Sequence, residues 1–160
     1  MLRIREYKPE DSGCVEACYV ELQDNERRLE PIRAEGRAVA EKYLARMFAR
    51  SAETGGAVFV AEVEERVVGF VCVWGRITVD ELINDESEFA YVSDLVVTND
   101  YRGRGIGHAL LERAEAFAVQ SGARRLRLGV LAKNESARKL YEKFGFSDFE
   151  VVMIKTLRDG

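Results

Sequence analysis

A run rich in glycine and arginine is the part of this chain whose residue types best suit chemistry. It follows an apolar stretch and reads Tyr101-Arg102-Gly103-Arg104-Gly105-Ile106-Gly107-His108. Glycines at alternate positions let the backbone approach a ligand closely and turn successive N–H groups toward it. The helix predicted to follow directs the positive end of its dipole at the same point, and two arginines add full charge. The run therefore predicts a site for phosphate or pyrophosphate.

Two common phosphate-binding loops do not fit this run. A Walker A loop ends in Gly-Lys-Ser/Thr, whereas Gly107 is followed by His108 and Ala109. The dinucleotide-binding fingerprint spaces its glycines as G-x-G-x-x-G, whereas here they are spaced G-x-G-x-G, and no acidic residue ends a second strand about twenty residues on. A solvated strand-to-helix turn stays open as the plain structural interpretation.

The elements that position this run are predicted from the period of the apolar residues. A period of two or a short apolar run indicates a strand, and a period of 3.6 indicates a helix. Strands are expected at residues 2–6, 57–63, 67–74, 89–98, 125–131 and 149–156. Helices are expected from Pro9 through Leu22, around residues 38–48, from Gly107 to Gly122 and at residues 137–144. The charged residues 24–28 are interpreted as a solvated helix end rather than a substrate contact.

This order of elements predicts an α/β fold with a mixed central sheet. Strands 89–98 and 125–131 are joined through a helix, so they are expected to run parallel. The pair Ser93-Asp94 interrupts an otherwise apolar strand, which predicts a β-bulge that leaves neighbouring backbone groups unpaired. Asn134 is a typical N-cap for the helix at residues 137–144.

Composition and length limit the class of protein. The chain has 160 residues, 47% of them hydrophobic, and we expect one domain spanning residues 1–160. The chain contains no apolar run long enough to span a membrane and no signal-peptide core, so a cytoplasmic protein without a membrane partner is expected. A net charge of −4 argues against a nucleic-acid partner. Three cysteines (Cys14, Cys18, Cys72) and one histidine favour buried thiols over disulfides or a metal site.

Two separated motifs resemble the GNAT (GCN5-related N-acetyltransferase) superfamily. The first is Arg102-x-x-Gly105-x-Gly107 between a strand and a helix, similar to that superfamily's acyl-CoA pyrophosphate loop. The second is Asn134-x-x-Ala137-x-x-x-Tyr141 followed by Gly145-Phe146. The resemblance covers residues 91–146. It implies that strands 89–98 and 125–131 splay apart, and that the pantetheine arm of acetyl-CoA inserts between them.

The resemblance also implies which residues bind the acyl donor, acetyl-CoA, without a metal. The backbones of Leu95, Val96 and Val97 are expected to bind the pantetheine, and the loop to bind the pyrophosphate. The loop residues are Arg102, Gly103, Arg104, Gly105, Ile106 and Gly107, and Asn134, Arg138 and Tyr141 complete the set. The implied reaction is direct attack of a primary amine on the thioester in a ternary complex.

The catalytic residues are less determined. By the resemblance Tyr141 protonates the departing thiolate, although an aromatic residue on a short helix is also typical of a core. A glutamate that such families often carry corresponds here to Gly129. Asp94, Glu88 and Tyr91 are therefore the candidates for the general base. Asp94 is preferred, because an acid in an apolar strand requires a reason, and stabilisation of the bulge is an equally good one.

The acceptor cannot be identified from a motif. Asp80, Glu81, Asp85, Glu86 and Glu88 precede a strand, and they favour a cationic amine, either a small molecule or a peptide, over a neutral one. A solvated surface loop is the alternative. Two other classes of function stay open: a catalytically silent acyl-CoA sensor and an assembly subunit with this fold. A homodimer is compatible with the sequence.

Overall fold

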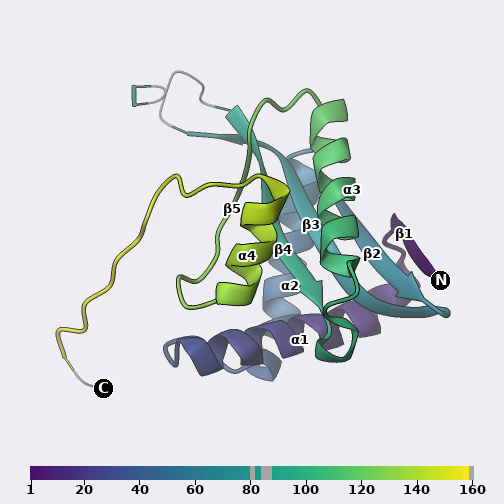
Figure 1. Cartoon of the computed structure of the whole chain (residues 1–160), viewed down its shortest axis with the longest axis horizontal. Helices are drawn as coiled ribbons and strands as arrows, with labels where there is room; N and C mark the ends of the chain where they lie inside the picture. The colour runs from purple at the N-terminus through teal and green to yellow at the C-terminus, as the bar shows by residue number, and fades with distance from the viewer. Residues whose placement is uncertain (80–81, 84–87, 159–160) are drawn as a thin grey trace.

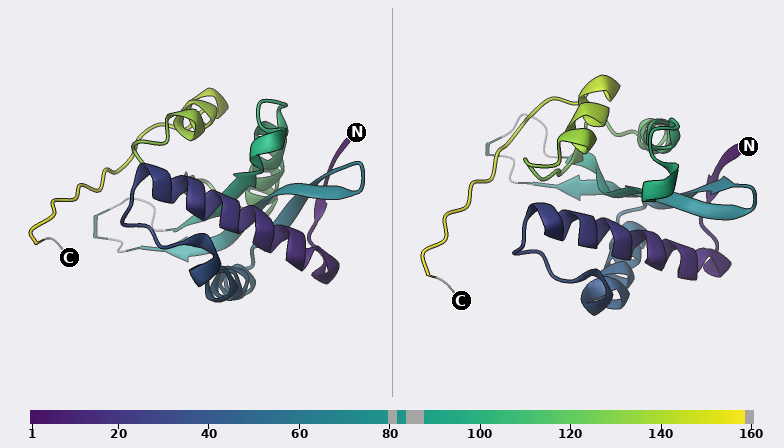
Figure 2. Two further views of the ribbon diagram at one scale, coloured as in Figure 1. Left: turned by 90° about the horizontal axis from the view of Figure 1, so that it is seen from below. Right: turned by 60° about the horizontal axis from the view of Figure 1, so that its bottom comes forward.

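The computed structural model describes residues 1–79, 82–83 and 88–158. In this part of the chain a five-stranded sheet lies between helices on both faces (Figures 1 and 2). The strand order is β1-β2-β3-β4-β5, with β1 to β4 antiparallel and β5 parallel to β4. The predicted α/β fold with a mixed sheet is thus confirmed.

The bounds of the elements are close to those predicted, except at the end of α1, which extends seven residues beyond Leu22, and near the C-terminus. The strands are β1 Leu2–Glu6, β2 Ala57–Val63, β3 Arg66–Thr78, β4 Glu88–Val97 and β5 Leu126–Leu128. The helices are α1 Ser12–Leu29, α2 Gly36–Glu53, α3 Ile106–Gln120 and α4 Glu135–Phe144, with short 3-10 turns η1 Pro9–Asp11 and η2 Asn99–Tyr101.

The prediction of a last strand at residues 149–156 was wrong. The described residues there lie in no strand, and the strand expected at residues 125–131 is reduced to Leu126–Leu128. The physical reason is that a strand needs a neighbour for its backbone hydrogen bonds, and this segment leaves the sheet instead of pairing with it (Figure 1).

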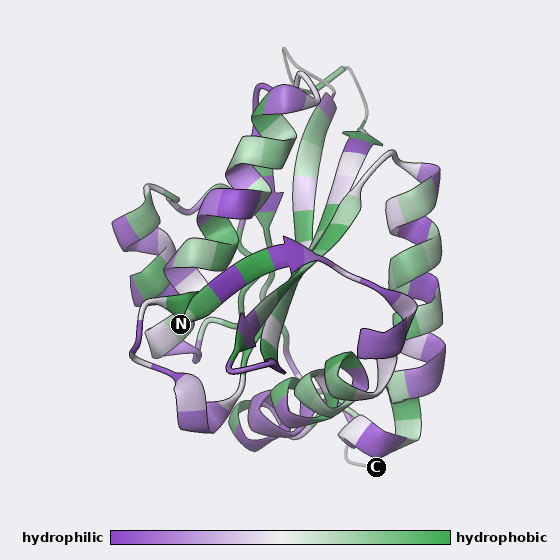
Figure 3. Ribbon diagram, turned by 90° about the vertical axis from the view of Figure 1, so that its right-hand side faces the viewer, coloured by the Kyte–Doolittle hydropathy of each residue, from purple (hydrophilic) through white to green (hydrophobic). Residues whose placement is uncertain are grey.

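Alternation along β3 divides the core into two layers. Phe70 and Cys72 pack with α1 and α2, whereas Val71 and Val73 pack with α3 on the other face. This follows from the pleat, because successive side chains of a strand point to opposite faces. Figure 3 shows the apolar residues concentrated on the central strands and striped along the helices. The sheet is therefore covered by a packed apolar layer on each face.

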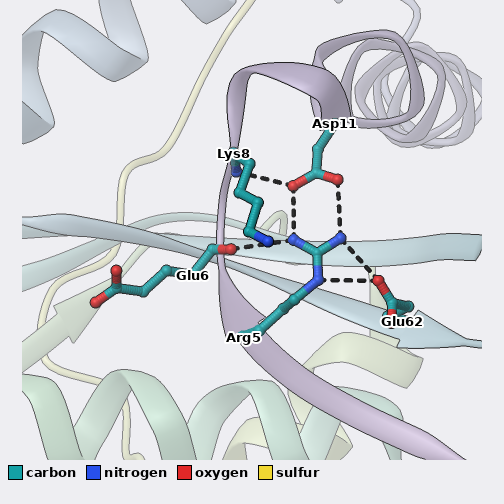
Figure 4. A network of polar contacts seen from close by, with 5 residues as sticks. All are labelled: Arg5, Glu6, Lys8, Asp11 and Glu62. Carbon is teal, nitrogen blue, oxygen red and sulfur yellow. Dashed lines mark hydrogen bonds and ion pairs between the residues drawn. The ribbon is translucent and has the colours of Figure 1, made fainter. Parts of the chain in front are cut away.

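A polar network fixes β1 to its surroundings (Figure 4). Arg5 makes two hydrogen bonds to the carboxylate of Asp11, at 2.8 and 2.9 Å, and another to Glu62 of β2 at 2.9 Å. The backbone N–H of Lys8 also donates to Asp11 at 2.8 Å. The network joins β1, η1 and β2, and none of Arg5, Asp11 and Glu62 lines the cavity described below, so it serves the fold.

Three further features complete the fold. No helix among the described residues is long and apolar enough to cross a membrane. The same residues contain no group of three or more His, Cys, Asp or Glu side chains that could hold a metal ion. Cys18 and Cys72 are buried thiols as predicted, whereas Cys14 is exposed.

Candidate active site

The site begins where β4 and β5 part. The last paired residues of the parallel ladder are Val92 and Leu128, although β4 continues to Val97. An open cavity lies beyond this point, and it is lined by β4, the glycine-rich loop, the end of β5 and α4. The splay expected between the two strands is therefore present, and it brings the two sequence motifs to one place.

A bulge in β4 determines which of its residues face α1 and α2 on one side of the sheet. Val92 pairs with Val73 and Asp94 pairs with Cys72, so Ser93 is an extra residue on β4. Because one extra residue reverses the alternation, Ala90 and Val92 pack toward α3, whereas Val96 packs toward α1 and α2. The predicted irregularity is confirmed, and it turns Asp94 toward the two N-terminal helices.

Asp94 is buried beneath the splay, against a tyrosine of α2. The hydroxyl of Tyr43 donates to both carboxylate oxygens, at 3.0 and 2.9 Å, and the ring of Tyr19 on α1 stacks on Tyr43 at 4.5 Å. Burial raises the pKa of Asp94 to about 7, and hydrogen bonding, chiefly from Tyr43, opposes that rise. A carboxylate with this pKa can take up or release a proton near neutral pH.

Tyr141 lines the same cavity from α4. Its ring is half-buried and lies 6.0 Å from the ring of Phe146. Burial, and then the negative charges of Glu26 and Asp94, raise the pKa of Tyr141 to about 12. The hydroxyl is therefore protonated at neutral pH and can donate a proton or a hydrogen bond, while the ring also packs as a core residue would.

The glycine-rich loop forms an open cradle at the start of α3. Gly103 and Gly105 have φ values of 74° and 80°, and a Cβ built on either would meet no atom within 4 Å. Gly105 precedes α3, and the first amides of a helix have no carbonyl of that helix to which they can donate. A side chain at Gly103 or Gly105 would occupy the open space beside the loop, where a ligand could accept hydrogen bonds from the backbone amides. The cradle therefore suits an anion.

The two loop arginines are exposed and held near the cradle. The Nε of Arg102 donates to the carbonyl of Val97 at 3.1 Å. Arg104 donates to the carbonyl of Asp100 at 3.1 Å, and its guanidinium lies 4.8 Å from the ring of Tyr101. Both positive charges thus lie at the rim of the loop, and Arg102 is also held at the end of β4.

Two further predicted residues line the cavity from the second motif. Asn134 caps α4, with its Oδ1 accepting from the N–H of Ala137 at 3.2 Å, as the sequence predicts. Arg138 is paired with Asp148 at 3.1 Å and lies 3.8 Å from Glu142. Both residues are therefore engaged by the fold as well as placed at the cavity.

The other candidates for the general base are placed differently. Tyr91 lines the cavity with its hydroxyl beside Gly129, and burial, followed by the negative charge of Asp94, raises its pKa. Glu88 begins β4 at the opposite end from the bulge and pairs with Arg76 at 2.9 Å. It does not line the cavity. Asp80, Glu81, Asp85 and Glu86 lie outside the described residues.

The structure adds Glu26, which the sequence interpretation of a solvated helix end missed. Helix α1 runs through Leu29, and Glu26 lines the cavity with a side chain only 20% exposed, 3.7 Å from Arg33. Burial raises its pKa. Tyr19, Gln23 and Glu26 are spaced for one helix face, so the period of the helix could have found it. Tyr43 was also missed, because its partner Asp94 is remote in sequence.

Comparison with known proteins agrees with this geometry. Residues 11–146 match the acetyltransferase (GNAT) family. An uncharacterized N-acetyltransferase of Methanocaldococcus jannaschii is 39% identical over 59% of this chain and 40% of its own length. A thialysine N-epsilon-acetyltransferase of Bos taurus is 38% identical over 36% of this chain and 34% of its own. This chain thus spans well under half of these relatives.

A solved structure agrees over nearly the whole chain. The GCN5-related N-acetyltransferase from Ralstonia eutropha superposes with a TM-score of 0.75, covering 98% of this chain and 99% of that one at 21% identity. At that identity the likeness concerns the fold alone.

Proposed function

The chain belongs to the acetyltransferase (GNAT) family, and from this premise we propose that it transfers the acetyl group of acetyl-CoA to a primary amine. The observation that carries the proposal is the cavity between β4 and β5, which gathers an anion cradle, a buried carboxylate and a protonated phenol. No one of these features would suffice. Together they supply what amine acylation requires: a held donor, a proton acceptor and a proton donor.

The residues present fit a bound acetyl-CoA. The loop from Arg102 to Gly107 would hold the pyrophosphate, since its glycines leave space and its amides and arginines favour negative charge. Leu95 and Val97 line the cavity, and the backbone of residues 95–97, beyond the last pair of the β4–β5 ladder, would hold the pantetheine, with Asn134 and Arg138 opposite. When bound, the donor supplies an acetyl group activated as a thioester.

Asp94 and Tyr141 have complementary acid-base properties. An amine attacks only when it is unprotonated, and Asp94, with a pKa of about 7, suits the acceptance of its proton. Tyr141 keeps its proton at neutral pH, so it suits donation to a departing thiolate. Of the three candidates for the base, Asp94 is our choice, because Glu88 lies outside the cavity and burial raises the pKa of Tyr91, so that its hydroxyl keeps its proton at neutral pH.

The acceptor is proposed to be a cationic amine. Glu26 and Asp94 bring two carboxyl groups to the α1–α2 side of the cavity, and Tyr19 and Tyr43 surround them with aromatic surface. Such a wall attracts a cation, and it stabilises an alkylammonium group better than a neutral or anionic one. The sequence pointed to acidic residues in another segment, and Glu26 now supports the same class of acceptor from described residues.

The test is release of CoA with a panel of amines, followed by mass spectrometry of the product. Lysine-like compounds, polyamines and peptides with basic N-termini should give N-acetylated products, while anionic amines should react poorly. Binding of acetyl-CoA by calorimetry without turnover on any amine would indicate a sensor. Absence of binding would remove the proposal altogether.

Glu26→Gln tests the acceptor separately. We expect KM for a cationic amine to rise about tenfold with KM for acetyl-CoA unchanged, because Glu26 lines the α1 side of the cavity, where we propose that the acceptor binds. Glu16→Gln is the matched control, since Glu16 is an exposed acid on the same helix. Equal effects of the two substitutions on the amine would contradict a role for Glu26.

A further inference from the structure

The chain beyond α4 is an exposed apolar arm. Residues 149–158 lie in no helix or strand, and Figures 1 and 2 show them running away from the sheet. Val152 is 91% exposed and Met153 is 90% exposed. The other large apolar residues of the arm are 69% to 83% exposed: Phe149, Val151, Ile154 and Leu157. Contiguous apolar surface of this kind marks an interface in soluble proteins.

The arm has the composition of a buried strand rather than of a tail. Four apolar residues follow one another from Val151 to Ile154, a pattern typical of a strand covered on both faces. Three of them are β-branched, which suits an extended, paired backbone. The arm is thus built to pair with a sheet edge that it does not reach in its own chain.

The sheet offers such an edge at β5. Among the described residues β5 has β4 as its only strand neighbour, and its three residues are half-buried. An edge strand carries unpaired N–H and C=O groups that can accept a further strand. Helix α4 beside it has no buried residue, although it presents Leu140, Tyr141 and Phe144. One strand would complete this end of the molecule.

The base of the arm is fixed in a direction that leaves the sheet. Asp148 is held by Arg138 at 3.1 Å, and the ring of Phe149 lies 4.6 Å from the guanidinium of Arg127 on β5. Beyond α4 the chain runs away from the sheet toward the C-terminus (Figure 1). Because the anchors hold its start, the arm is presented outward, where a second molecule can take it up.

We propose that two copies of this chain exchange their C-terminal arms, each arm adding a strand to the β5 edge of the other copy. The exchange is isologous, since each copy supplies one arm and one edge, so it closes as a dimer and does not extend into a filament. Residues 149–156, which the sequence predicts as the last strand, then form a strand in the sheet of the other copy. This inference is independent of the proposed reaction.

The shape of the candidate active site also supports a strand from a second copy at the β5 edge. Its cavity measures about 1780 Å³ and is bounded on one side by arm residues 149–152 and on another by Glu30 and Ile32. Ligand sites are commonly about 300–1,000 Å³, so this cavity is large, and it is open to solvent. A strand from the second copy at the β5 edge would narrow it and wall the site.

Sedimentation velocity of the full chain tests the exchange. We expect a species of twice the 18.1 kDa chain mass, and a monomer for the double variant Val152→Asp/Met153→Asp. Val119→Asp is the matched control, because Val119 is a 66% exposed apolar residue on α3 and should leave the dimer intact. A chain ending at Ser147 repeats the test without new charges, and circular dichroism checks the fold of each variant.

Hydrogen exchange identifies which surfaces meet. Amides of residues 126–128 and 150–154 should be protected in the dimer and should lose protection together in the double variant. A full chain that sediments as a monomer overturns the proposal. This includes a monomer whose arm amides are protected from hydrogen exchange, because its arm would then have paired with β5 of the same chain. A dimer that survives the double substitution, or one in which the arm is protected and β5 is not, overturns it as well.

Discussion

At the scale of single residues, Asp94 has the most unusual position. It is a carboxylic acid in the middle of an apolar strand, buried against the phenol of Tyr43, with its pKa raised to about 7. If Asp94 served only to stabilise the bulge, its hydrogen bonds with Tyr43 would be sufficient and no proton transfer would be needed. Because Asp94 lines the cavity, we propose that it also acts on a substrate there, and kinetics can separate the two roles.

We expect Asp94→Asn to lower kcat/KM about a hundredfold or more, because the amide cannot accept the amine's proton. In the parent enzyme kcat/KM should rise with pH through about 7, as Asp94 becomes ionised, and this limb should vanish in the variant. A pH profile from about pH 5.5 to 9 measures both. An unchanged limb would assign the ionisation to another group.

Tyr43→Phe is the positioning control for Asp94. The Tyr43 hydroxyl stabilises the ionised carboxylate, so its removal should raise the pKa of Asp94 and move the limb of the profile to higher pH. A purely structural loss would lower activity equally at every pH and leave the limb in place.

Tyr141→Phe tests the proton donor. The change keeps the ring and its contact with Phe146 while removing the hydroxyl, so turnover should fall roughly a hundredfold with acetyl-CoA affinity nearly unchanged. Single-turnover rates and calorimetry provide the two quantities. Phe144 on the same helix offers a packing control, since Phe144→Leu should alter stability more than turnover. A fully active Tyr141→Phe variant would reduce Tyr141 to a packing residue.

At the scale of elements, the loop and α3 act as one anion-binding unit. Gly105→Val should reduce acetyl-CoA affinity at least about tenfold, since a branched side chain would enter the open cradle. Backbone strain at a φ of 80° would also lower stability. Gly122→Val is therefore the control, because Gly122 lies just beyond the other end of the same helix with a φ of 87° and equally open surroundings. Equal affinity of the two variants would argue that the loop is only a turn.

The elements also show what could be predicted from sequence. The loop, the start of α3 and the cap of α4 depend on neighbouring residues, so glycine spacing and Asn134 predict them. The bulge at Ser93 is similarly local. The bond between Tyr43 and Asp94 joins residues 51 apart, and no local pattern encodes it. The last strand failed for a related reason: residues 149–156 have strand character, but pairing depends on a neighbour that their own chain does not bring to them.

At the scale of the whole molecule, the parts of the chain before and after the start of β5 have different tasks. The sheet from β1 to β4 and its covering helices form two continuous apolar layers. Within the described residues, the segment from β5 onward contributes no fully buried apolar side chain to this core. The part before β5 thus carries Asp94 and the anion loop, whereas Tyr141 and the arm belong to the part that a second copy would complete.

The network of Arg5, Asp11 and Glu62 belongs to the part of the chain before β5. It should govern the stability of this part in acid. The hydrogen bonds from Arg5 lower the pKa of Asp11 below its ordinary value of 3.8. A group whose pKa is lower in the folded state contributes stability above its unfolded pKa and loses it as pH falls through the folded value. Asp11→Asn should therefore cost about 1–3 kcal/mol of unfolding free energy at pH 7.

Urea unfolding at about pH 7 and about pH 3 measures this contribution. The difference between the parent and Asp11→Asn should shrink at the lower pH, because protonation weakens the same bonds in the parent. Glu53→Gln is the control: its pair with Arg50, at 3.8 Å, is exposed on both sides, so the substitution should cost less than about 0.5 kcal/mol at either pH. A difference between parent and Asp11→Asn that is equal at both pH values would mean that Asp11 acts through shape and not through charge.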